Sequence, residues 1–330
     1  MSFLELIDKK ICELKSNKKI ILPESNDRRI LKAAEIILKD KKIDLILVGN
    51  KDEIVKNNSD LDLNNAEFID TNNRKVQNDL ATKLYELRKE KGLTLEKAKD
   101  LIKNNLYFSV MLVKEKYADG IVAGATNFTA DVLRPAFQIL KTKPGIKLVS
   151  SFFVIEVKNK DFGHKGILFF SDCAINQNPS SEELAYIAES SATSFENLIG
   201  QKPKVALLSH STKKSSKHSD VDKIIKAVEI LKNKKVNFDF DGELQVDAAL
   251  VESVAKLKTD NINVAGHSNV LIFPDLDAGN IGYKLVQRLG EANAYGPITQ
   301  GIFSPVNDLS RGCDIKDIVG VIKITAAQSF

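Results

Sequence analysis

The sequence predicts an α/β protein of two domains, with mostly parallel sheets and helices on both faces of each sheet. Two observations lead to this prediction. Short apolar runs alternate with amphipathic segments along the whole chain, and 330 residues exceed what one hydrophobic core usually fills. The strand-like runs lie at 19–23, 44–49, 119–124, 149–157, 166–172, 204–211 and 269–276.

Two of the intervening segments have clear helical periodicity. In residues 182–198 apolar or small side chains recur every three or four positions, and Ser180 with Glu183 forms a capping-box pattern at the start. Residues 221–231 repeat the periodicity. The predicted buried faces consist of Leu184, Ile187, Ala188, Ser191, Phe195 and Leu198 in the first helix, and Val221, Ile224, Ile225, Val228 and Leu231 in the second.

The domain boundaries are predicted from two turns. Pro144-Gly145 follows a helix-like segment, and Gly296-Pro297 precedes the last part of the chain. We therefore expect a discontinuous first domain, residues 1–145 plus 297–330, and a second domain, residues 146–296, with the active site in the cleft between them.

Composition excludes several classes of protein. Lys plus Arg is 48 and Asp plus Glu is 44, so the net charge of +4 is too small to indicate nucleic-acid binding. No apolar run approaches the roughly 18 residues that span a bilayer, and the first residues lack the long apolar segment of a signal peptide. The three cysteines form no close pair, which favours a reducing compartment. We expect a cytoplasmic protein that binds no membrane.

Residues 118–138 read as a buried strand followed by small and polar residues and then a helix. Ligands of open α/β sheets bind at such strand ends, where small residues expose backbone N–H groups. Arg134, directly before Pro135, is positioned to hold a phosphate group. The alternative is an ordinary tight turn with a surface arginine.

Residues 307–317, NDLSRGCDIKD, place several reactive side chains in a predicted loop that leads into a last helix. Asp314 is a natural N-cap and Asp317 falls at the third helical position, so Asp317 serves either as part of a cap or in chemistry. Ser310 and Arg311 precede the helix N-terminus, whose free N–H groups favour an anion. A phosphate site is one interpretation and a capped loop is the other.

Two further stretches contain paired carboxylates. Asp275, Asp277 and Asn280 follow a strand, ahead of a helix expected from about Ile281, and resemble a magnesium site; the alternative is a capped turn. Glu243 and Asp247 are predicted to lie four residues apart on one helix face, either for acid–base work or on a solvated or dimer-facing surface.

Taken together, several segments resemble phosphate acetyltransferases in the same order along nearly the whole chain. The segment PVNDLSRGC followed by DIV resembles the carboxyl-terminal signature of that family. The other matching segments are PESNDRRILKAAE at 23–35, ADGIVAGATNFTADVLRPAFQ at 118–138, SDCAINQNPSSEELAYIA at 171–188, DGELQVDAAL at 241–250 and FPDLDAGNIGYKLVQRLG at 273–290.

The resemblance implies a fold similar to isocitrate and isopropylmalate dehydrogenases, a homodimer, and reversible acetyl transfer between acetyl phosphate and coenzyme A with inorganic phosphate as the other product. It implies that Asp317 deprotonates the coenzyme A thiol and that Ser310 orients the thiol or hydrogen-bonds the reacting centre. Arg311 would neutralise the acyl phosphate and the charge that develops on its carbonyl oxygen. Arg134 and Arg88, the latter in YELRKEKG, would hold substrate phosphates, and Cys313 would line the substrate site. No metal and no tightly bound cofactor are expected.

Alternatives remain open within and beyond this family. A phosphate butyryltransferase or a nicotinamide-dependent decarboxylating dehydrogenase could share the architecture, as could a scaffold protein without catalysis. Cys313 could instead act as an acetylated nucleophile, although no histidine lies near it in the sequence. The segment 209–220, which contains Lys213, Lys214, Lys217 and His218, departs from the family pattern and reads as a basic surface loop or a phosphate contact.

Overall fold

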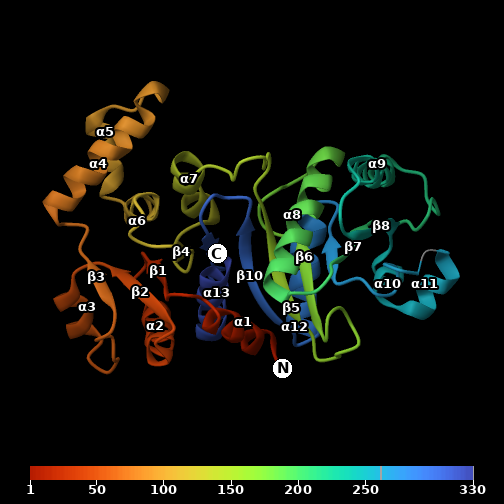
Figure 1. Cartoon of the computed structure of the whole chain (residues 1–330), viewed down its shortest axis with the longest axis horizontal. Coiled ribbons are helices and arrows are strands. Elements are labelled where there is room, and N and C mark those ends of the chain that lie inside the picture. Colours follow the sequence, from red (N-terminus) through yellow and green to blue (C-terminus); the bar gives the residue numbers. More distant parts are fainter. Residues whose placement is uncertain (261, 330) are drawn as a thin grey trace. The chain divides into compact units, whose positions relative to one another are not determined.

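The chain folds as two units, each built around one β-sheet (Figure 1). The computed structural model describes residues 1–260 and 262–329. The terminal unit comprises Leu4–Lys143 and Ile302–Phe330, and the middle unit comprises Met1–Phe3 and Pro144–Gly301. The first of these is therefore assembled from two segments that lie far apart in the sequence.

The terminal unit contains a parallel sheet and its surrounding helices. In chain order its elements are α1 (Phe3–Cys12), β1 (Lys18–Leu22), α2 (Arg28–Asp40), β2 (Ile43–Val48), α3 (Lys51–Asn57), β3 (Glu67–Ile69), α4 (Arg74–Arg88), the short 3-10 helix η1 (Lys89–Lys91), α5 (Leu95–Ile102), α6 (Asn105–Lys114), β4 (Gly120–Ala123), α7 (Thr129–Ile139), β11 (Val306–Asp308) and α13 (Ile315–Gln328).

All strand pairs of this sheet are parallel, and the strand order is β11-β4-β1-β2-β3. The chain therefore fills one side of β1 with β2 and β3 and then crosses to the other side to form β4. Such a reversal leaves a crevice outside the carboxyl ends of the two central strands, where the following loops diverge. In this unit the crevice lies beyond β1 and β4, and β11 lies directly beside them.

The helix α13 forms much of the core of the terminal unit. It contacts β1, β4, β11 and α2, whereas α6 contacts β4 and packs on α7. Residues 318–327 of α13 are all buried. The one charged side chain in this stretch, Lys323, forms an ion pair of 2.8 Å with Asp8. A terminal helix buried along its length fixes the position of its own N-terminus and of the loop that precedes it.

The middle unit contains a mixed sheet with helices between the strands. In chain order its elements are β5 (Ser150–Glu156), β6 (Ile167–Ser171), α8 (Ser181–Ile199), β7 (Lys204–Leu208), α9 (Ser219–Lys234), β8 (Asp239–Leu244), α10 (Val246–Leu250), α11 (Glu252–Lys258), β9 (Val270–Ile272), α12 (Leu276–Leu289) and β10 (Asn293–Gln300).

The sheet of the middle unit has the order β10-β5-β6-β9-β7-β8, in which β10, β5 and β6 pair antiparallel and the other pairs are parallel. Helices cover both of its faces. Phe153 stacks on Tyr283 of α12, with ring centroids 3.9 Å apart, whereas Phe169 meets Phe195 of α8 at 5.1 Å. Phe152 stacks on Phe169 and so points away from its neighbour Phe153, as alternate strand residues do.

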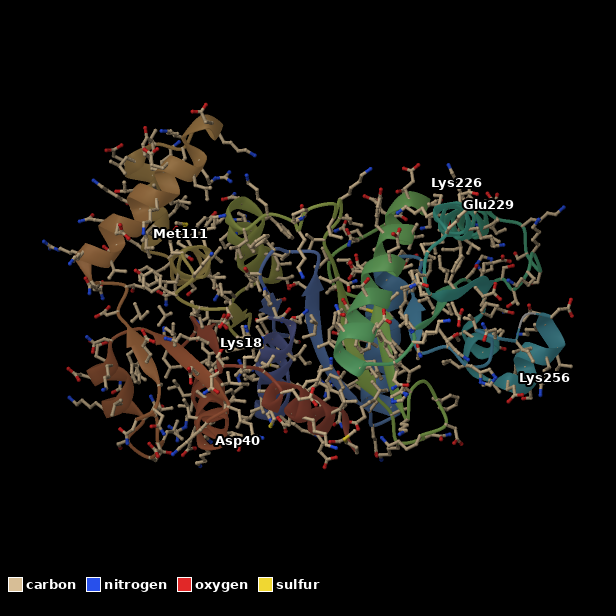
Figure 2. All side chains as sticks on the ribbon, in the orientation of Figure 1. Lys18, Asp40, Met111, Lys226, Glu229 and Lys256 are labelled. Atoms are coloured by element: carbon tan, nitrogen blue, oxygen red, sulfur yellow. The ribbon has the colours of Figure 1, made fainter. Side chains whose placement is uncertain are left out.

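The sequence-based predictions for the two helices of this unit are confirmed. Ser180 and Glu183 form a capping box at the start of α8, and the predicted apolar face of α8 is buried. In α9 the predicted face is also buried, except that Ile225 is only partly covered. Lys226 and Glu229 project from α9 on its exposed side (Figure 2).

The predicted α/β class with mostly parallel sheets is confirmed. Among the described residues, no helix is long and apolar enough to cross a membrane. One boundary differs from the prediction: α12 begins at Leu276 rather than near Ile281, because Asp275 accepts a hydrogen bond from the Ala278 backbone and caps the helix earlier.

Candidate active site

Three loops meet at the carboxyl edge of the terminal sheet. They follow the neighbouring parallel strands β1, β4 and β11, so their first residues emerge side by side. The loops are residues 23–27, 124–128 and 309–314. The loops lead into α2, α7 and α13, which places three helix N-termini at the same edge. This is the crevice in which open α/β sheets bind their ligands.

Glu24, in the first loop, connects it to the second loop by hydrogen bonds. Its buried carboxylate accepts hydrogen bonds from the backbone N–H groups of Gly124 (2.8 Å), Ala125 (2.8 Å), Thr126 (3.1 Å) and Asn127 (3.0 Å). The Thr126 hydroxyl and the Asn127 amide also donate to it, at 2.9 Å and 2.6 Å. A carboxylate with six donors satisfies a whole turn of backbone that would otherwise be exposed or left without partners.

The second and third loops approach each other closely at Gly124. Its φ is +113°, and a Cβ there would lie 2.1 Å from Oδ1 of Asp308 and 2.6 Å from the backbone nitrogen of Leu309. Only glycine fits, both sterically and in its backbone conformation. The Thr129 hydroxyl, at the start of α7, donates a short hydrogen bond to Oδ2 of Asp308. The end of β11 is thus packed directly on the loop after β4.

The carboxyl of Asp308, the last residue of β11, has a strongly raised pKa. Burial raises the pKa of its carboxyl to about 7, and the nearby Glu24 carboxylate adds to the rise. The Thr129 bond and the Leu309 backbone N–H lower that pKa in part. Its buried Oδ1 has no hydrogen-bond partner among residues 1–260 and 262–329. The carboxyl beneath the third loop is therefore about half protonated near neutral pH.

The third loop presents two exposed polar side chains ahead of α13. Ser310 and Arg311 are both exposed, and the Arg311 guanidinium lies 4.3 Å from the centre of the Phe128 ring at the start of α7. A turn precedes the helix: the Cys313 N–H donates to the Ser310 carbonyl at 2.9 Å. A hydroxyl and a guanidinium are thereby held where a helix N-terminus favours negative charge.

Asp317 completes a capping box with Asp314. Its N–H donates to the Asp314 side chain at 2.8 Å, and its own Oδ2 accepts from the Asp314 N–H at 3.1 Å. The structural interpretation of Asp317 as part of a cap is therefore confirmed. Asp317 remains half-buried, and its charge helps to raise the pKa of the Cys313 thiol, so the two side chains lie close together.

Cys313 is a buried thiol rather than a thiolate. Burial raises its pKa to about 11, Asp317 and Asp27 add to the rise, and the Arg29 guanidinium opposes it. At pH 7 a thiol with that pKa is ionised in only about one molecule in ten thousand. Its side chain is 6% exposed. An activated nucleophilic cysteine needs the opposite environment, partly exposed and electropositive.

Arg88 and Arg134 form a second cluster around Tyr107. Arg88, at the end of α4, donates to the Gln138 carbonyl at 2.7 Å, and Tyr107 donates to the Gln138 side chain at 2.9 Å. Arg134 lies on α7, 58% exposed, with Asp131 at 3.3 Å. Burial raises the pKa of Tyr107, and Arg134 and Arg88 lower it in part. α7 therefore joins the two clusters, with Phe128 at its start and Arg134 one to two turns later.

A cavity of about 490 Å³ opens beside the first two loops. Its walls combine amide side chains from the 23–27 loop, the 124–128 loop and the start of α6 with the charged side chains of Glu24, Asp27 and Lys103. The lining residues are Pro23, Glu24, Asn26, Asp27, Lys103, Asn104, Asn105, Leu106, Thr126 and Asn127. The cavity suits a polar group that both donates and accepts hydrogen bonds.

Two of the three side chains predicted as a magnesium site, Asp275 and Asn280, form hydrogen bonds within the fold. Asp275 caps α12, and the Asn280 amide donates to the Cys173 carbonyl at 3.1 Å. Over the described ranges, no group of three or more His, Cys, Asp or Glu side chains is arranged to hold a metal ion. The interpretation of 275–280 as a capped turn therefore accounts for Asp275.

The prediction that Glu243 and Asp247 share a helix face is wrong. Glu243 is the buried penultimate residue of β8, whereas Asp247 lies in α10 and pairs with Lys258 at 2.8 Å. Gly242 allows the strand to pass close to its neighbour, so the strand continues where the helix was expected. The basic loop is also anchored: Lys213 pairs with Asp241, and the Lys214 N–H donates to Glu243 at 2.5 Å.

The sequence reasoning missed the residues that assemble the loops. Glu24, Asp27, Arg29, Asp308 and Thr129 were not singled out, although the segment 23–35 was noted for its resemblance. One signal was available: the charged residues that follow the strand at 19–23 occupy the edge where ligands bind. Asp27 and Arg29 pair locally, but nothing in the local sequence identifies the partners in the other loops, which lie 96 to 284 residues away.

Fold and site together define a two-unit α/β protein with an anion-suited loop at the switch point of a parallel sheet. A sequence model of the family described as phosphate acetyl/butaryl transferase matches residues 2–326. The chain belongs to this family.

Individual relatives agree with the family match. The chain is 58% identical to a phosphate acetyltransferase of Thermoanaerobacterium thermosaccharolyticum over 99% of this chain and all of that one. It superposes on a phosphotransacetylase from Streptococcus pyogenes with a TM-score of 0.91, at 42% identity, covering 100% of this chain and 99% of that one.

A more distant structure extends the comparison of folds. A 4-hydroxythreonine-4-phosphate dehydrogenase from Salmonella typhimurium has a TM-score of 0.57 at 12% identity, with 95% of this chain and 99% of that one covered. That likeness concerns the fold alone, and it agrees with the expected resemblance to dehydrogenase architectures.

Proposed function

We propose that the chain catalyses the reversible transfer of an acetyl group between acetyl phosphate and coenzyme A. Family membership and the 58% identity to a phosphate acetyltransferase support the reaction class. The observation that carries the proposal is the loop between β11 and α13, where exposed Ser310 and Arg311 precede the helix whose first turn contains the half-buried Asp317. A hydroxyl, a cation and a base are the groups that thiol attack on an acyl phosphate requires.

In the proposed reaction the sulfur of coenzyme A attacks the carbonyl carbon of acetyl phosphate directly. Asp317 takes the proton from sulfur, a carbon–sulfur bond forms, and the bond between the carbonyl carbon and the phosphate oxygen breaks. Inorganic phosphate leaves, and the proton on Asp317 passes to it or to solvent. Arg311 balances charge on the carbonyl oxygen and the phosphate, and Ser310 orients the thiol. Arg88 and Arg134 hold substrate phosphates.

The proton transfer is feasible in energy. An ordinary thiol and an ordinary aspartic acid differ by about 4.6 pKa units, which corresponds to an uphill transfer of roughly 6 kcal/mol. Enzymatic barriers of about 15 kcal/mol accommodate that cost. A guanidinium beside the developing thiolate reduces it, and holding both substrates together lowers the barrier further.

The competing mechanism through an acetylated Cys313 has less support. The thiol is buried, and its pKa of about 11 leaves almost no thiolate at neutral pH. We therefore assign Cys313 to the wall of the substrate site. Direct transfer needs no acylated protein, so no burst of bound acetyl group is expected when substrate is mixed with enzyme.

One assay tests the activity and separates its alternatives. Purified protein is incubated with inorganic phosphate and acetyl-, butyryl- or longer acyl-coenzyme A, and released thiol is measured. We expect release to be fastest with acetyl-coenzyme A. Preference for butyryl-coenzyme A would indicate a phosphate butyryltransferase. Release of no thiol from any of them would contradict the proposal, and reduction of a nicotinamide cofactor in a parallel assay would indicate a dehydrogenase.

Two further properties belong to the proposal. We expect a homodimer, which light scattering after gel filtration would test by mass. We also expect a cytoplasmic location, where coenzyme A is available and where the three free cysteines, Cys12, Cys173 and Cys313, would stay reduced. Coenzyme A acts as a substrate in this scheme, without a tightly bound cofactor.

A further inference from the structure

Arg29, in the first turn of α2, contacts two of the three loops at once. One terminal nitrogen donates to the carbonyl oxygens of Arg311 at 2.9 Å and Cys313 at 3.0 Å. The other donates to the carbonyl oxygen of Ala125 at 2.9 Å. These three carbonyls belong to the loops after β11 and β4. A single guanidinium therefore joins the backbone on both sides of Gly312 to the neighbouring loop.

The orientation of this guanidinium is itself fixed by Asp27. The Asp27 carboxylate accepts from Nε of Arg29 at 3.1 Å and from a terminal nitrogen at 2.7 Å. It also accepts the Arg29 backbone N–H at 2.7 Å, which caps α2. These bonds hold the pKa of Asp27 below its ordinary value, since the side-chain bond to Arg29 is the largest influence. The Arg29 guanidinium is thus held on one edge by two bonds to the Asp27 carboxylate, and its remaining N–H groups point at carbonyl oxygens of the two loops.

Only arginine can make this set of bonds. Its planar group has five N–H donors in a rigid fork, whereas a lysine ammonium has three donors around one atom. A lysine at position 29 could reach some of the carbonyls but could not bridge both loops while staying paired with Asp27. The contacts that Arg29 makes with the two loops are all to main-chain oxygens, so they fix the path of the loop backbone and do not act on a side chain.

We propose that Arg29 is a positioning residue, which fixes the turn at residues 311–313 against the loop after β4 so that Ser310 and Arg311 face the substrates. This inference rests on the proposed acetyl transfer. Arg29 acts through the backbone, because its donors point at carbonyl oxygens. A displacement of about 1 Å in such a loop costs on the order of 100-fold in rate.

The first test compares Arg29→Gln and Arg29→Lys with the matched control Arg28→Gln. Arg28 is the neighbouring residue of α2, and its exposed side chain pairs with Asn58 and Asp60 away from the loops. We expect Arg29→Gln to lower kcat about 100-fold with KM for acetyl phosphate within about threefold. The kcat of Arg29→Lys should lie between those of Arg29→Gln and the wild type, and the kcat of Arg28→Gln should equal that of the wild type.

The second test follows the loop without relying on activity. The rate at which a small maleimide modifies each cysteine is measured by mass spectrometry in wild type and variants. Cys12 is exposed and serves as a reference for reagent, whereas Cys173 is 0% exposed and reports unfolding of the middle unit. We expect Arg29→Gln to speed modification of Cys313 at least about tenfold, through local opening, with Cys12 and Cys173 unchanged.

Either test can overturn the proposal. A kcat for Arg29→Gln within threefold of that for Arg28→Gln would do so, as would an unchanged rate at Cys313. If Arg29→Gln lacks a cooperative thermal transition, it is not folded, and the kcat and the Cys313 modification rate of Arg29→Lys are used to decide instead. If both variants lack it, Arg29 is required for the fold and a role confined to the loop is excluded. A wild type without acetyl transfer would refute the proposed function, and the modification rates would still decide whether Arg29 holds the loop.

Discussion

Glu24 in the terminal unit and Asp172 in the middle unit are buried carboxylates just after the carboxyl ends of strands, and both accept hydrogen bonds from loop N–H groups. Asp172 accepts from Ala174 at 2.9 Å, Ile175 at 3.2 Å and Asn176 at 3.1 Å, which all belong to its own turn. Glu24 accepts from a loop about 100 residues further on. Similar chemistry stabilises a local turn in one unit and assembles a site from distant segments in the other.

The difference follows from strand order. Asp172 follows β6, and its backbone donors lie between β6 and α8, so the chain turns around its own carboxylate, to which the Ser151 hydroxyl of the neighbouring strand β5 also donates. Glu24 follows β1, whose parallel neighbour β4 arrives after β2 and β3 have been placed on the other side. The loops after β1 and β4 are therefore adjacent in space only, and a carboxylate is needed to join them.

The largest expected effect concerns Asp317, in the first turn of the helix that follows the loop held by Arg29. Asp317→Asn should lower kcat by about 10² to 10⁴, the usual contribution of a general base. Asparagine at the third helical position keeps one carbonyl oxygen for the Asp314 N–H, so the fold should persist. The measurement is steady-state thiol release.

Asp314→Asn is the control for this substitution. Asparagine is as good an N-cap as aspartate, so this variant keeps the cap and should keep activity close to wild type. Wild-type turnover in Asp317→Asn would exclude the base role, and equal losses in the two variants would show that the effect is not specific to the Asp317 carboxylate.

The comparison between Glu24 and Asp172 is tested by amide replacement at each. Glu24→Gln and Asp172→Asn should each destabilise their unit by about 2–4 kcal/mol, because an amide group is introduced among N–H donors. The rates of amide hydrogen exchange then distinguish the two variants. Glu24→Gln should speed exchange at residues 124–127, far away in the sequence, whereas Asp172→Asn should speed it only at 174–176. Exchange confined to residues near 24 in the first variant would contradict the bridging role.

A smaller effect is expected from the pH dependence of Asp308. Its folded pKa of about 7 exceeds the ordinary 3.8, so folding favours the protonated carboxyl. Below pH 4 both states are protonated and there is no cost. Between pH 4 and 7 only the unfolded state ionises, so stability falls as pH rises, by about 4 kcal/mol at most.

Asp308→Asn removes this titration and can still accept the Thr129 hydrogen bond. We expect the variant to gain about 2 kcal/mol relative to wild type between pH 5 and pH 8, about half the upper bound. Urea denaturation at the two pH values measures the difference. Parallel stability curves for variant and wild type would show that Asp308 is already ionised, or equally exposed, in the folded protein.

The smallest effect is expected at Cys313. Cys313→Ala should keep kcat within about threefold and lose about 1 kcal/mol of stability, because a small buried side chain is shortened without leaving a large cavity. Initial rates and thermal denaturation measure both. Near-total loss of turnover in a folded Cys313→Ala protein would instead support the acetylated-cysteine mechanism.

Much of the fold was predictable because its signals are local. The alternation of apolar runs and amphipathic segments identified the α/β class, and the capping boxes at Ser180 and Asp314 were readable within four residues of sequence. Where a competing local signal existed, prediction failed: Glu243 was placed on a helix, although the chain continues as β8. The candidate loop at 307–317 was found from local spacing, but its first two residues belong to β11.

By itself, the sequence determined the α/β class, the positions of seven strands, where α8 and α13 begin, and that a serine, an arginine and an aspartate surround the start of the last helix. Only the tertiary structure decided that Glu24 holds residues 124–127, that Arg29 holds residues 125, 311 and 313, and that Cys313 and Asp308 are buried. The physical reason is that helix periodicity and capping act over a few residues, whereas strand order sets which loops become neighbours. Burial, and with it the pKa of a thiol or a carboxyl, exists only once those neighbours are in place.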